Sequence, residues 1–346
     1  MTADPYAAPP AGATALVTGA TGFTGSVLVR RLVERGVRVT AIARRGSRLD
    51  HLAAVDVTWV RGEVDDPETI GAATVGVEYV FHLAAAYREA RRSEADYRRV
   101  HVTSTERLAE RVARRPGFRR FVHVSTIGVH GHIADPPADE RAPFRPDDDY
   151  QRTKAAAEEW LHDFARAQSL PYTVIRPCAI YGPGDRRLWK LFRLVRWGVF
   201  PLLGSGRGLY HLIHVDDLVA ALMRAAVHPA AAGESFIAGN REWTTLEHMA
   251  RVIAGALGRR VRVVRLPARP FMMGAAACEA VCRPLGLEPP LHRRRVAFYT
   301  KDRAFDTSKL RQVLGFIPSH GTDEGLVEAA RWYVDRGWLP ASRSDR

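Results

Sequence analysis

A tyrosine and a lysine stand four residues apart in the stretch Tyr150-Gln151-Arg152-Thr153-Lys154. On a helix this spacing places both side chains on one face, one turn apart. A free tyrosine has a pKa of about 10, and a neighbouring ammonium favours the phenolate, which permits proton transfer near neutral pH. The pair therefore predicts acid/base chemistry, although Tyr-x-x-x-Lys also occurs by chance in many helices.

Upstream of this pair, Ser125 and Thr126 end an apolar run that begins at Phe121. If the run is a parallel strand, it presents these hydroxyls at the sheet edge where such folds bind their ligands. The sequence therefore predicts that a strand-end hydroxyl and the Tyr-x-x-x-Lys helix belong to one site.

A glycine-rich stretch, Thr18–Gly25, lies between an apolar run at 13–17 and an amphipathic segment at 26–35. This pattern predicts a buried strand, a tight turn and a helix whose N-terminus faces the turn. Free backbone N–H groups and the helix dipole attract phosphate there, and glycine lets the backbone approach a pyrophosphate. We expect a dinucleotide site, the alternative being a plain strand-turn-helix.

The residues after the second predicted strand bear on the choice of dinucleotide. A carboxylate there favours NAD, whereas arginine favours the 2′-phosphate of NADP. The chain has no acid at this point and reads Ala43-Arg44-Arg45-Gly46-Ser47. We expect NADP rather than NAD, the alternative being that Arg44 and Arg45 are two solvated arginines in an arginine-rich chain.

Strand and helix patterns alternate through the first half of the chain, which predicts an α/β fold with a Rossmann-type doubly wound parallel sheet. The predicted strands are 13–17, 37–43, 57–60, 79–83, 121–125 and 172–176. We expect an NAD(P)-binding domain at 13–176, to which later segments return, and a smaller C-terminal lobe at 177–338, mainly for substrate. An apolar helix at 270–282 is expected to be buried core or a flap over the substrate.

The composition narrows the function classes. The 346 residues carry a formal charge of +13, yet no stretch interleaves basic and aromatic residues, so we expect no nucleic-acid partner. Three cysteines are too few for a disulfide framework. With no signal-peptide pattern and no apolar run of membrane-spanning length, we expect a cytoplasmic protein without stable membrane insertion.

With these motifs the chain resembles the extended short-chain dehydrogenase/reductases, which include NAD(P)-dependent epimerases and dehydratases. The resemblance covers residues 13–338. Besides the glycine-rich stretch and Tyr150 with Lys154, it rests on His82–Ala85, Val124–Thr126 before Val129–Gly131, Arg176–Gly184, Ile213–Asp217 and Leu314–Pro318.

The resemblance implies catalytic roles for three residues. Tyr150 would be the acid/base, and Lys154 would lower its pKa and hold the nicotinamide ribose. Thr126, five residues before Gly131, would hold the substrate oxygen, with Ser125 as the alternative.

The resemblance also implies how cofactor and substrate are bound. Glu63 stands where the family usually has Asp, and His101 where it typically has Asn. Substrate contacts are expected from Tyr87, Arg207 and Tyr210. The expected cofactor-binding residues are Gly19, Thr21, Gly22, Phe23, Thr24, Gly25, Arg44, Arg45, Glu63, Val64, Leu83, Ala84, Ala85, Ser125, Tyr150, Lys154, Pro177 and Ile180.

Two reaction classes share these motifs. Sugar-nucleotide members commonly carry Arg where this chain has Tyr210, although Arg207 could compensate. In addition, the stretches 266–291 and 305–309 look like those of 3β-hydroxysteroid dehydrogenases and dihydroflavonol reductases. We therefore expect an oxidoreductase acting on a small, hydrophobic carbonyl or secondary alcohol. The alternative is a nucleotide-sugar epimerase or dehydratase with tightly bound NAD. A cofactor-binding regulator without catalysis is disfavoured by the intact triad.

Two further expectations complete the sequence-based prediction. We expect no metal, because no carboxylate can be assigned at metal-binding spacing to the histidines near the site edge, which are His123, His130, His132, His211 and His214. From the resemblance we expect a homodimer that packs through the helices predicted at 97–114 and 153–167.

Overall fold

The computed structural model describes residues 7–86, 93–282 and 302–340, together with Leu287, Pro289, Pro290, Arg293, Val296 and Tyr299. Its central sheet consists of β1 (Thr14–Thr18), β2 (Arg38–Ala43), β3 (Val57–Arg61), β4 (Tyr79–His82), β5 (Arg120–Val124), β6 (Tyr172–Pro177) and β11 (Ser235–Ala238). All neighbours are parallel and the order is β11-β6-β5-β4-β1-β2-β3. The order reverses between β1 and β4, as in a doubly wound sheet, so the predicted Rossmann-type fold is confirmed.

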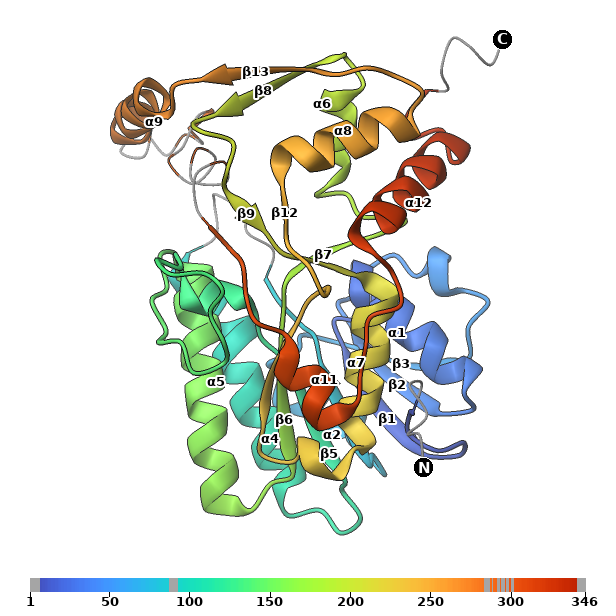
Figure 1. Cartoon of the computed structure of the whole chain (residues 1–346). Coiled ribbons are helices and arrows are strands. Elements are labelled where there is room, and N and C mark those ends of the chain that lie inside the picture. The colour runs from blue at the N-terminus through green and yellow to red at the C-terminus, as the bar shows by residue number, and fades with distance from the viewer. Residues whose placement is uncertain are drawn as a thin grey trace.

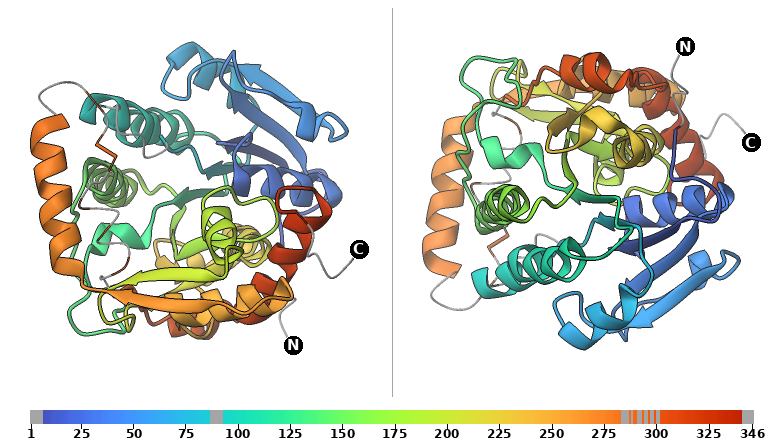
Figure 2. Two further views of the ribbon diagram at one scale, coloured as in Figure 1. Left: turned by 90° about the horizontal axis from the view of Figure 1, so that it is seen from above. Right: turned by 90° about the horizontal axis from the view of Figure 1, so that it is seen from below.

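Helices cover both faces of this sheet (Figure 2). They are α1 (Phe23–Glu34), α2 (Pro67–Ala73), α4 (Ser104–Ala113), α5 (Asp149–Gln168) and α7 (Val215–Val227). Side chains of α1 and α7 share one apolar core with the sheet, and those of α2, α4 and α5 share another. Leu16 and Val17 of β1 join different cores, because successive side chains of a strand point to opposite faces. A strand that is buried on both faces therefore needs apolar residues at successive positions, not at alternate ones.

The smaller lobe lies above the carboxyl edge of the sheet (Figure 1). Its strands are β7 (Ala179–Tyr181), β8 (Val199–Leu203), β9 (Leu209–Tyr210), β10 (Leu212–His214), β12 (Thr244–Thr245) and β13 (Arg262–Leu266). They pair as β7 with β10, β8 with β13 and β9 with β12. Its helices are α6 (Trp189–Val195), α8 (Leu246–Ala256), α9 (Ala268–Cys282) and α12 (Thr322–Asp335). A separate apolar core holds α6, α8 and α12 together, and later segments such as α7, β11 and α11 (Ser308–Leu314) pack with the sheet.

The sequence predicted one helix over 97–114, and the structure divides this region. α3 (Glu94–Arg98) is followed by a π-helical turn, Arg99–Thr103, and then by α4. The extra residue in a π turn changes the direction of the side chains that follow, and such turns are frequent at functional sites. Here the turn contains His101, which is fully buried.

The apolar helix α9 lies at the outside of the smaller lobe (Figure 2). Only Ala275 and Glu279 of this helix are buried, and Met273 is 73% exposed. The alternative that this helix is buried core is therefore wrong. Across the described parts of the chain, no helix combines the length and the apolar character that crossing a bilayer requires.

Candidate active site

The glycine-rich turn between β1 and α1 is packed so closely that side chains at two of its glycines would collide with backbone. Gly19 has φ +71°, and a Cβ there would lie 2.8 Å from the carbonyl group of Leu83. A Cβ at Gly25 would collide with the carbonyl of Gly19. Gly22 is the N-cap of α1, and no side chain caps this helix, so its first backbone N–H groups can bind phosphate. The turn fits the pyrophosphate of a dinucleotide.

A buried hydroxyl–imidazole network holds the end of β4 against this turn. Thr18 Oγ1 accepts from Ala84 N at 3.1 Å and lies 2.7 Å from His82 Nδ1. Ser104 and Thr105 donate their hydroxyl protons to carbonyls one turn earlier, so His82 Nε2, 3.1 Å from both, must donate to them. His82 Nδ1 therefore accepts from Thr18, and burial lowers the pKa of this imidazole to about 3. His82 is a neutral structural histidine.

His101 connects the loop after β4 to the start of α5. Its Nε2 accepts from Ala86 N at 3.1 Å, so its Nδ1 carries the proton and donates to Thr153 Oγ1 at 2.8 Å. Thr153 in turn donates to the Asp149 carbonyl at 2.7 Å. The imidazole also packs edge-on against the Tyr150 ring, with 5.1 Å between ring centres. Histidine at this position therefore fixes the conformation of both segments.

Tyr150 and Lys154 lie on α5, next to the carboxyl end of β5. The Lys154 side chain is 2% exposed, and its Nζ donates to the Val124 carbonyl at 2.9 Å. Burial lowers the pKa of Lys154 to about 8, and the charge of Glu158 acts in the opposite direction. Thr126, two residues after Val124, is half-buried and accepts from Gly128 N at 3.1 Å. The structure thus joins the Tyr-x-x-x-Lys helix to the strand end that carries the hydroxyls.

Glu158, one turn beyond Lys154, is part of a buried charge cluster that we did not predict. Its Oε1 accepts from Arg176 Nε at 2.9 Å and Nη2 at 2.6 Å, and both side chains are at most 5% exposed. Although burial raises the pKa of Glu158, a hydrogen bond from His162 and the charge of Arg176 lower it to about 2. In the sequence, the i, i+4 spacing of Lys154 and Glu158 places both side chains on one face of the helix.

The loop after β2 borders a surface pocket of about 480 Å³. The guanidinium of Arg61 donates to the carbonyls of Arg44 and Ser47 at 3.1 and 3.0 Å, which orders the loop. The side chains of Arg44 and Arg45 are exposed. The pocket is lined by Arg44, Arg45, Gly46, Ser47, Gly62 and Glu63.

The remaining expected cofactor residues lie around the carboxyl edge of the sheet. Val64, Ala84, Ser125 and Pro177 are buried and Ala85 is exposed. Half-buried positions are Thr21, Phe23, Thr24, Leu83 and Ile180.

The expected substrate residues have different environments. Tyr210 is 4% exposed, and the Arg303 guanidinium lies over its ring, 5.7 Å from the centre. Burial raises the pKa of this phenol. Arg207 is exposed in the preceding loop, and Tyr87 lies outside the described residues.

Residues 15–239 match the model of the NAD dependent epimerase/dehydratase family. The chain belongs to this family. Its seven-stranded parallel sheet and glycine-rich turn agree with that membership, and the resemblance to the extended short-chain dehydrogenase/reductases is confirmed.

Relatives of this family member include both reaction classes. A 2-alkyl-3-oxoalkanoate reductase of Stenotrophomonas maltophilia is 31% identical, over 90% of this chain and 96% of its own. A UDP-glucose 4-epimerase of Mycolicibacterium smegmatis is 30% identical, over 93% and 98%. Sterol demethylase protein B of Methylococcus capsulatus is 30% identical, over 94% and 100%. The relatives are enzymes, and this family member is an NAD(P)-dependent enzyme.

The fold is shared with a protein of known structure over nearly the full length of both chains. The structure of MoeE5 in complex with UDP-glucuronic acid and NAD is 27% identical and has a TM-score of 0.73, over 94% of this chain and 100% of its own. This family member therefore shares its overall fold with a protein that was solved in complex with NAD.

Proposed function

We propose that this protein is an NAD(P)-dependent oxidoreductase that exchanges a hydride between nicotinamide and a carbonyl or secondary alcohol of a small, apolar substrate. The observation that carries this proposal is the buried Lys154 ammonium one turn from Tyr150, at the end of the strand that leads to Thr126. A fixed positive charge beside a phenol favours its anion and so assists proton transfer.

In this proposal the glycine-rich turn holds the pyrophosphate, Lys154 holds the nicotinamide ribose, and Pro177 and Ile180 cover the nicotinamide. When bound, the cofactor supplies or accepts the hydride. In the reductive direction, Tyr150 donates its phenolic proton to the oxygen of the substrate as the alcohol forms. The Lys154 ammonium stabilises the resulting phenolate.

Thr126 is suited to hold the substrate oxygen. Its Oγ1 accepts a hydrogen bond from Gly128 N, so its hydroxyl proton remains to be donated to a ligand. Such a donor stabilises the negative charge that develops on the oxygen during hydride transfer. Ser125 is 3% exposed, which favours Thr126 for this role.

We further propose NADP as the preferred cofactor, with Arg44 and Arg45 binding its 2′-phosphate. A hydrogen bond to a charged group is worth about 1.5–3 kcal/mol, and the Arg44→Ala, Arg45→Ala double variant loses at least two such bonds to the 2′-phosphate. It should therefore bind NADPH at least about 100-fold more weakly than the wild type does. Its NADH affinity should stay near the wild-type value. Fluorescence titration of both cofactors measures this.

Arg48→Ala is the matched control for the cofactor variants, because Arg48 is exposed nearby and pairs with Asp50 at 2.8 Å. It should bind both cofactors as the wild type does. An equal loss of NADH and NADPH affinity in the double variant would contradict a phosphate-specific role.

The preference for a small apolar substrate is supported by Tyr210, which puts a buried phenol where sugar-nucleotide members commonly carry arginine, and by the 2-alkyl-3-oxoalkanoate reductase relative. Two observations favour the alternative, a nucleotide-sugar epimerase. Arg303 stacks on Tyr210 and brings a cation to the same place, and one relative is named a UDP-glucose 4-epimerase.

Analysis of the bound nicotinamide tests the choice between the two. A reductase releases its cofactor in every cycle, so the purified protein should hold little nicotinamide and bind added NADPH reversibly. An epimerase instead reduces and then reoxidises the same bound cofactor in every cycle, without releasing it. Stoichiometric NAD that survives purification would therefore overturn both the reductase and the NADP proposals.

A cytoplasmic homodimer that packs through α4 and α5 completes the proposal. The two helices lie side by side, and α5 carries a stacked, half-buried aromatic pair, Trp160 and Phe164, with 4.6 Å between ring centres. Half-buried aromatic side chains are typical of the centre of protein interfaces.

A further inference from the structure

Almost the entire net charge of the chain comes from two segments of the smaller lobe. Residues 186–215 and residues 248–278 contain six basic residues each and no Asp or Glu, whereas the rest of the chain has 39 basic and 38 acidic residues. The first segment includes α6 and β8, and the second includes β13 and most of α9. Because β8 and β13 pair along their whole length, the fold brings the two cationic segments together.

β8, β13 and α9 lie at the end of the smaller lobe that faces away from the central sheet (Figure 1). The turn that follows α6 is held against the start of β13, where Arg262 N donates to the Gly198 carbonyl at 2.8 Å. The side chains of Arg260, Arg262 and Arg269 are exposed, and none of them forms an ion pair with another residue that the structure describes. Glu247 pairs with two of the other cations. The three arginine charges therefore remain available to a partner outside the molecule.

Apolar side chains lie among these arginines. Trp197 is 72% exposed and Val199 is 48% exposed. Val199 stands beside Arg262 in the register of the two strands, and Val264, two residues further along β13, points to the same side of the pair. Val264 belongs to none of the apolar cores found among the described residues. We call this patch the apical surface, and it consists of Trp197, Val199, Arg260, Arg262, Val264 and Arg269.

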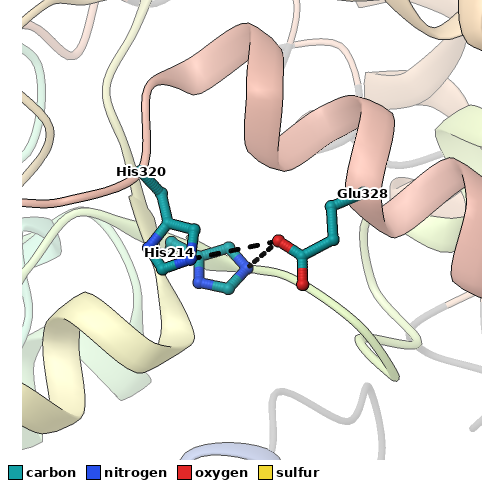
Figure 3. Close-up of side chains that lie close together, drawn as sticks. All are labelled: His214, His320 and Glu328. Atoms are coloured by element: carbon teal, nitrogen blue, oxygen red, sulfur yellow. Dashed lines mark ion pairs between the residues drawn. The ribbon is translucent and has the colours of Figure 1, made fainter.

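Acidic side chains of α12, by contrast, face other partners. Glu328 faces the stacked rings of His214 and His320, whose centres lie 3.9 Å apart, and its Oε2 is 3.6 Å from His214 Nε2 (Figure 3). Asp323 pairs with His248 at 2.9 Å. Positive and negative charges of the smaller lobe are thus separated onto different elements, and the apical surface keeps its positive potential.

The combination of cationic and apolar side chains decides which kind of partner fits the apical surface. A nucleic acid pairs with arginines through its phosphates but offers aliphatic side chains no apolar environment. An anionic lipid bilayer offers both, because its headgroup phosphates attract basic residues and its boundary with the acyl chains takes up aliphatic side chains and tryptophan. The apical surface matches the bilayer.

We propose that the apical surface docks this protein reversibly on an anionic lipid bilayer. The contact is peripheral: the arginines meet the headgroups, the apolar side chains enter the boundary below them, and no helix crosses the bilayer. Because the central sheet lies at the other end of the molecule (Figure 1), the nucleotide-binding turn stays in contact with water. The docking does not depend on the proposed activity, although an apolar substrate would concentrate in the same bilayer.

The test is co-sedimentation of the full-length protein with vesicles. Vesicles of phosphatidylcholine and phosphatidylglycerol in equal amounts should bind the protein, vesicles of phosphatidylcholine alone should not, and added NaCl should weaken the binding. One basic residue near an anionic surface strengthens binding about fivefold. The triple variant Arg260→Gln, Arg262→Gln, Arg269→Gln should therefore bind about 100-fold more weakly.

A second triple variant, Arg35→Gln, Arg141→Gln, Arg145→Gln, is the matched control for charge. It removes the same number of exposed arginines from outside both cationic segments, and should lose affinity by at most about twofold, because salt screens charges that are more than about 10 Å from the bilayer. Equal losses in the two triple variants would show a general effect of net charge and would overturn the proposal.

Trp197→Asp tests the apolar part of the apical surface, with Val75→Asp as its control. Trp197 and Val75 are 72% and 73% exposed, and each is the second residue after a helix, α6 or α2. Each also precedes a glycine with positive φ, Gly198 or Gly76, so the two substitutions make the same change in the same kind of turn. Trp197→Asp should weaken vesicle binding by more than about tenfold, and Val75→Asp should leave it unchanged.

Circular dichroism and Tm should be the same for all four variants as for the wild type, because every substituted side chain is exposed. Failure of the wild type to bind the anionic vesicles would overturn the proposal. So would a DNA duplex that displaces the vesicles while Trp197→Asp binds as the wild type does, because the surface would then recognise polyanions rather than a bilayer.

Discussion

Replacing Tyr150 by phenylalanine should lower kcat by about 10²- to 10⁴-fold, which is the usual contribution of a positioned acid or base. The substitution removes the phenolic proton and keeps the ring that packs edge-on against His101. Cofactor affinity should change by no more than about tenfold, because one neutral hydrogen bond is worth about 0.5–1.5 kcal/mol. Nicotinamide absorbance follows turnover with a 2-alkyl-3-oxoalkanoate or a 3β-hydroxysteroid as the probe, and chromatography of the sugar nucleotide follows turnover of UDP-glucose.

Tyr97→Phe is the matched control, because the buried Tyr97 ring lies edge-on to Tyr150 at 6.3 Å. It makes the same chemical change on a neighbouring helix and should retain most of the activity. If Tyr150→Phe kept more than a tenth of the wild-type kcat, Tyr150 would not be the acid/base.

The sheet and its phosphate-binding turn could be predicted because their signals are local. Each of the six predicted strands forms within one residue of its expected ends, and Gly19 and Gly25 fill positions where a Cβ would collide with backbone. The seventh strand, β11, was missed because Ser235–Ala238 is short and follows a region expected in the other lobe. Its place in the sheet depends on pairing with β6, a contact between distant segments.

The site was harder to predict wherever geometry depends on such distant contacts. No periodicity predicts the π-helical turn that directs His101 toward both Ala86 and Thr153. The same holds for His320 and Glu328, which approach His214 only because α12 returns to the end of β10. Sequence spacing predicts chemistry within one element, whereas assembly across elements requires the fold.

Glu158→Gln should lower the free energy of unfolding by about 3–5 kcal/mol, the cost of breaking a buried ion pair from one side. The carboxylate accepts two hydrogen bonds from Arg176, and an amide would leave that guanidinium without its counter-charge. Denaturant titration measures the loss. Asp163→Asn makes the same change in an exposed ion pair with Arg166 on the same helix, and should cost at most about 1 kcal/mol.

The pH dependence of this loss identifies its electrostatic origin. Folding lowers the pKa of Glu158 from 4.5 to about 2, so the carboxylate stabilises the folded state fully above about pH 5 and loses this effect as the pH falls through 2. The difference between wild type and Glu158→Gln should shrink over the same range. A difference that stayed constant with pH would indicate a packing defect instead. Because Glu158 also raises the pKa of Lys154, the variant should lose the Lys154 ammonium at a lower pH, which connects the stability of this cluster to the proposed chemistry of Tyr150.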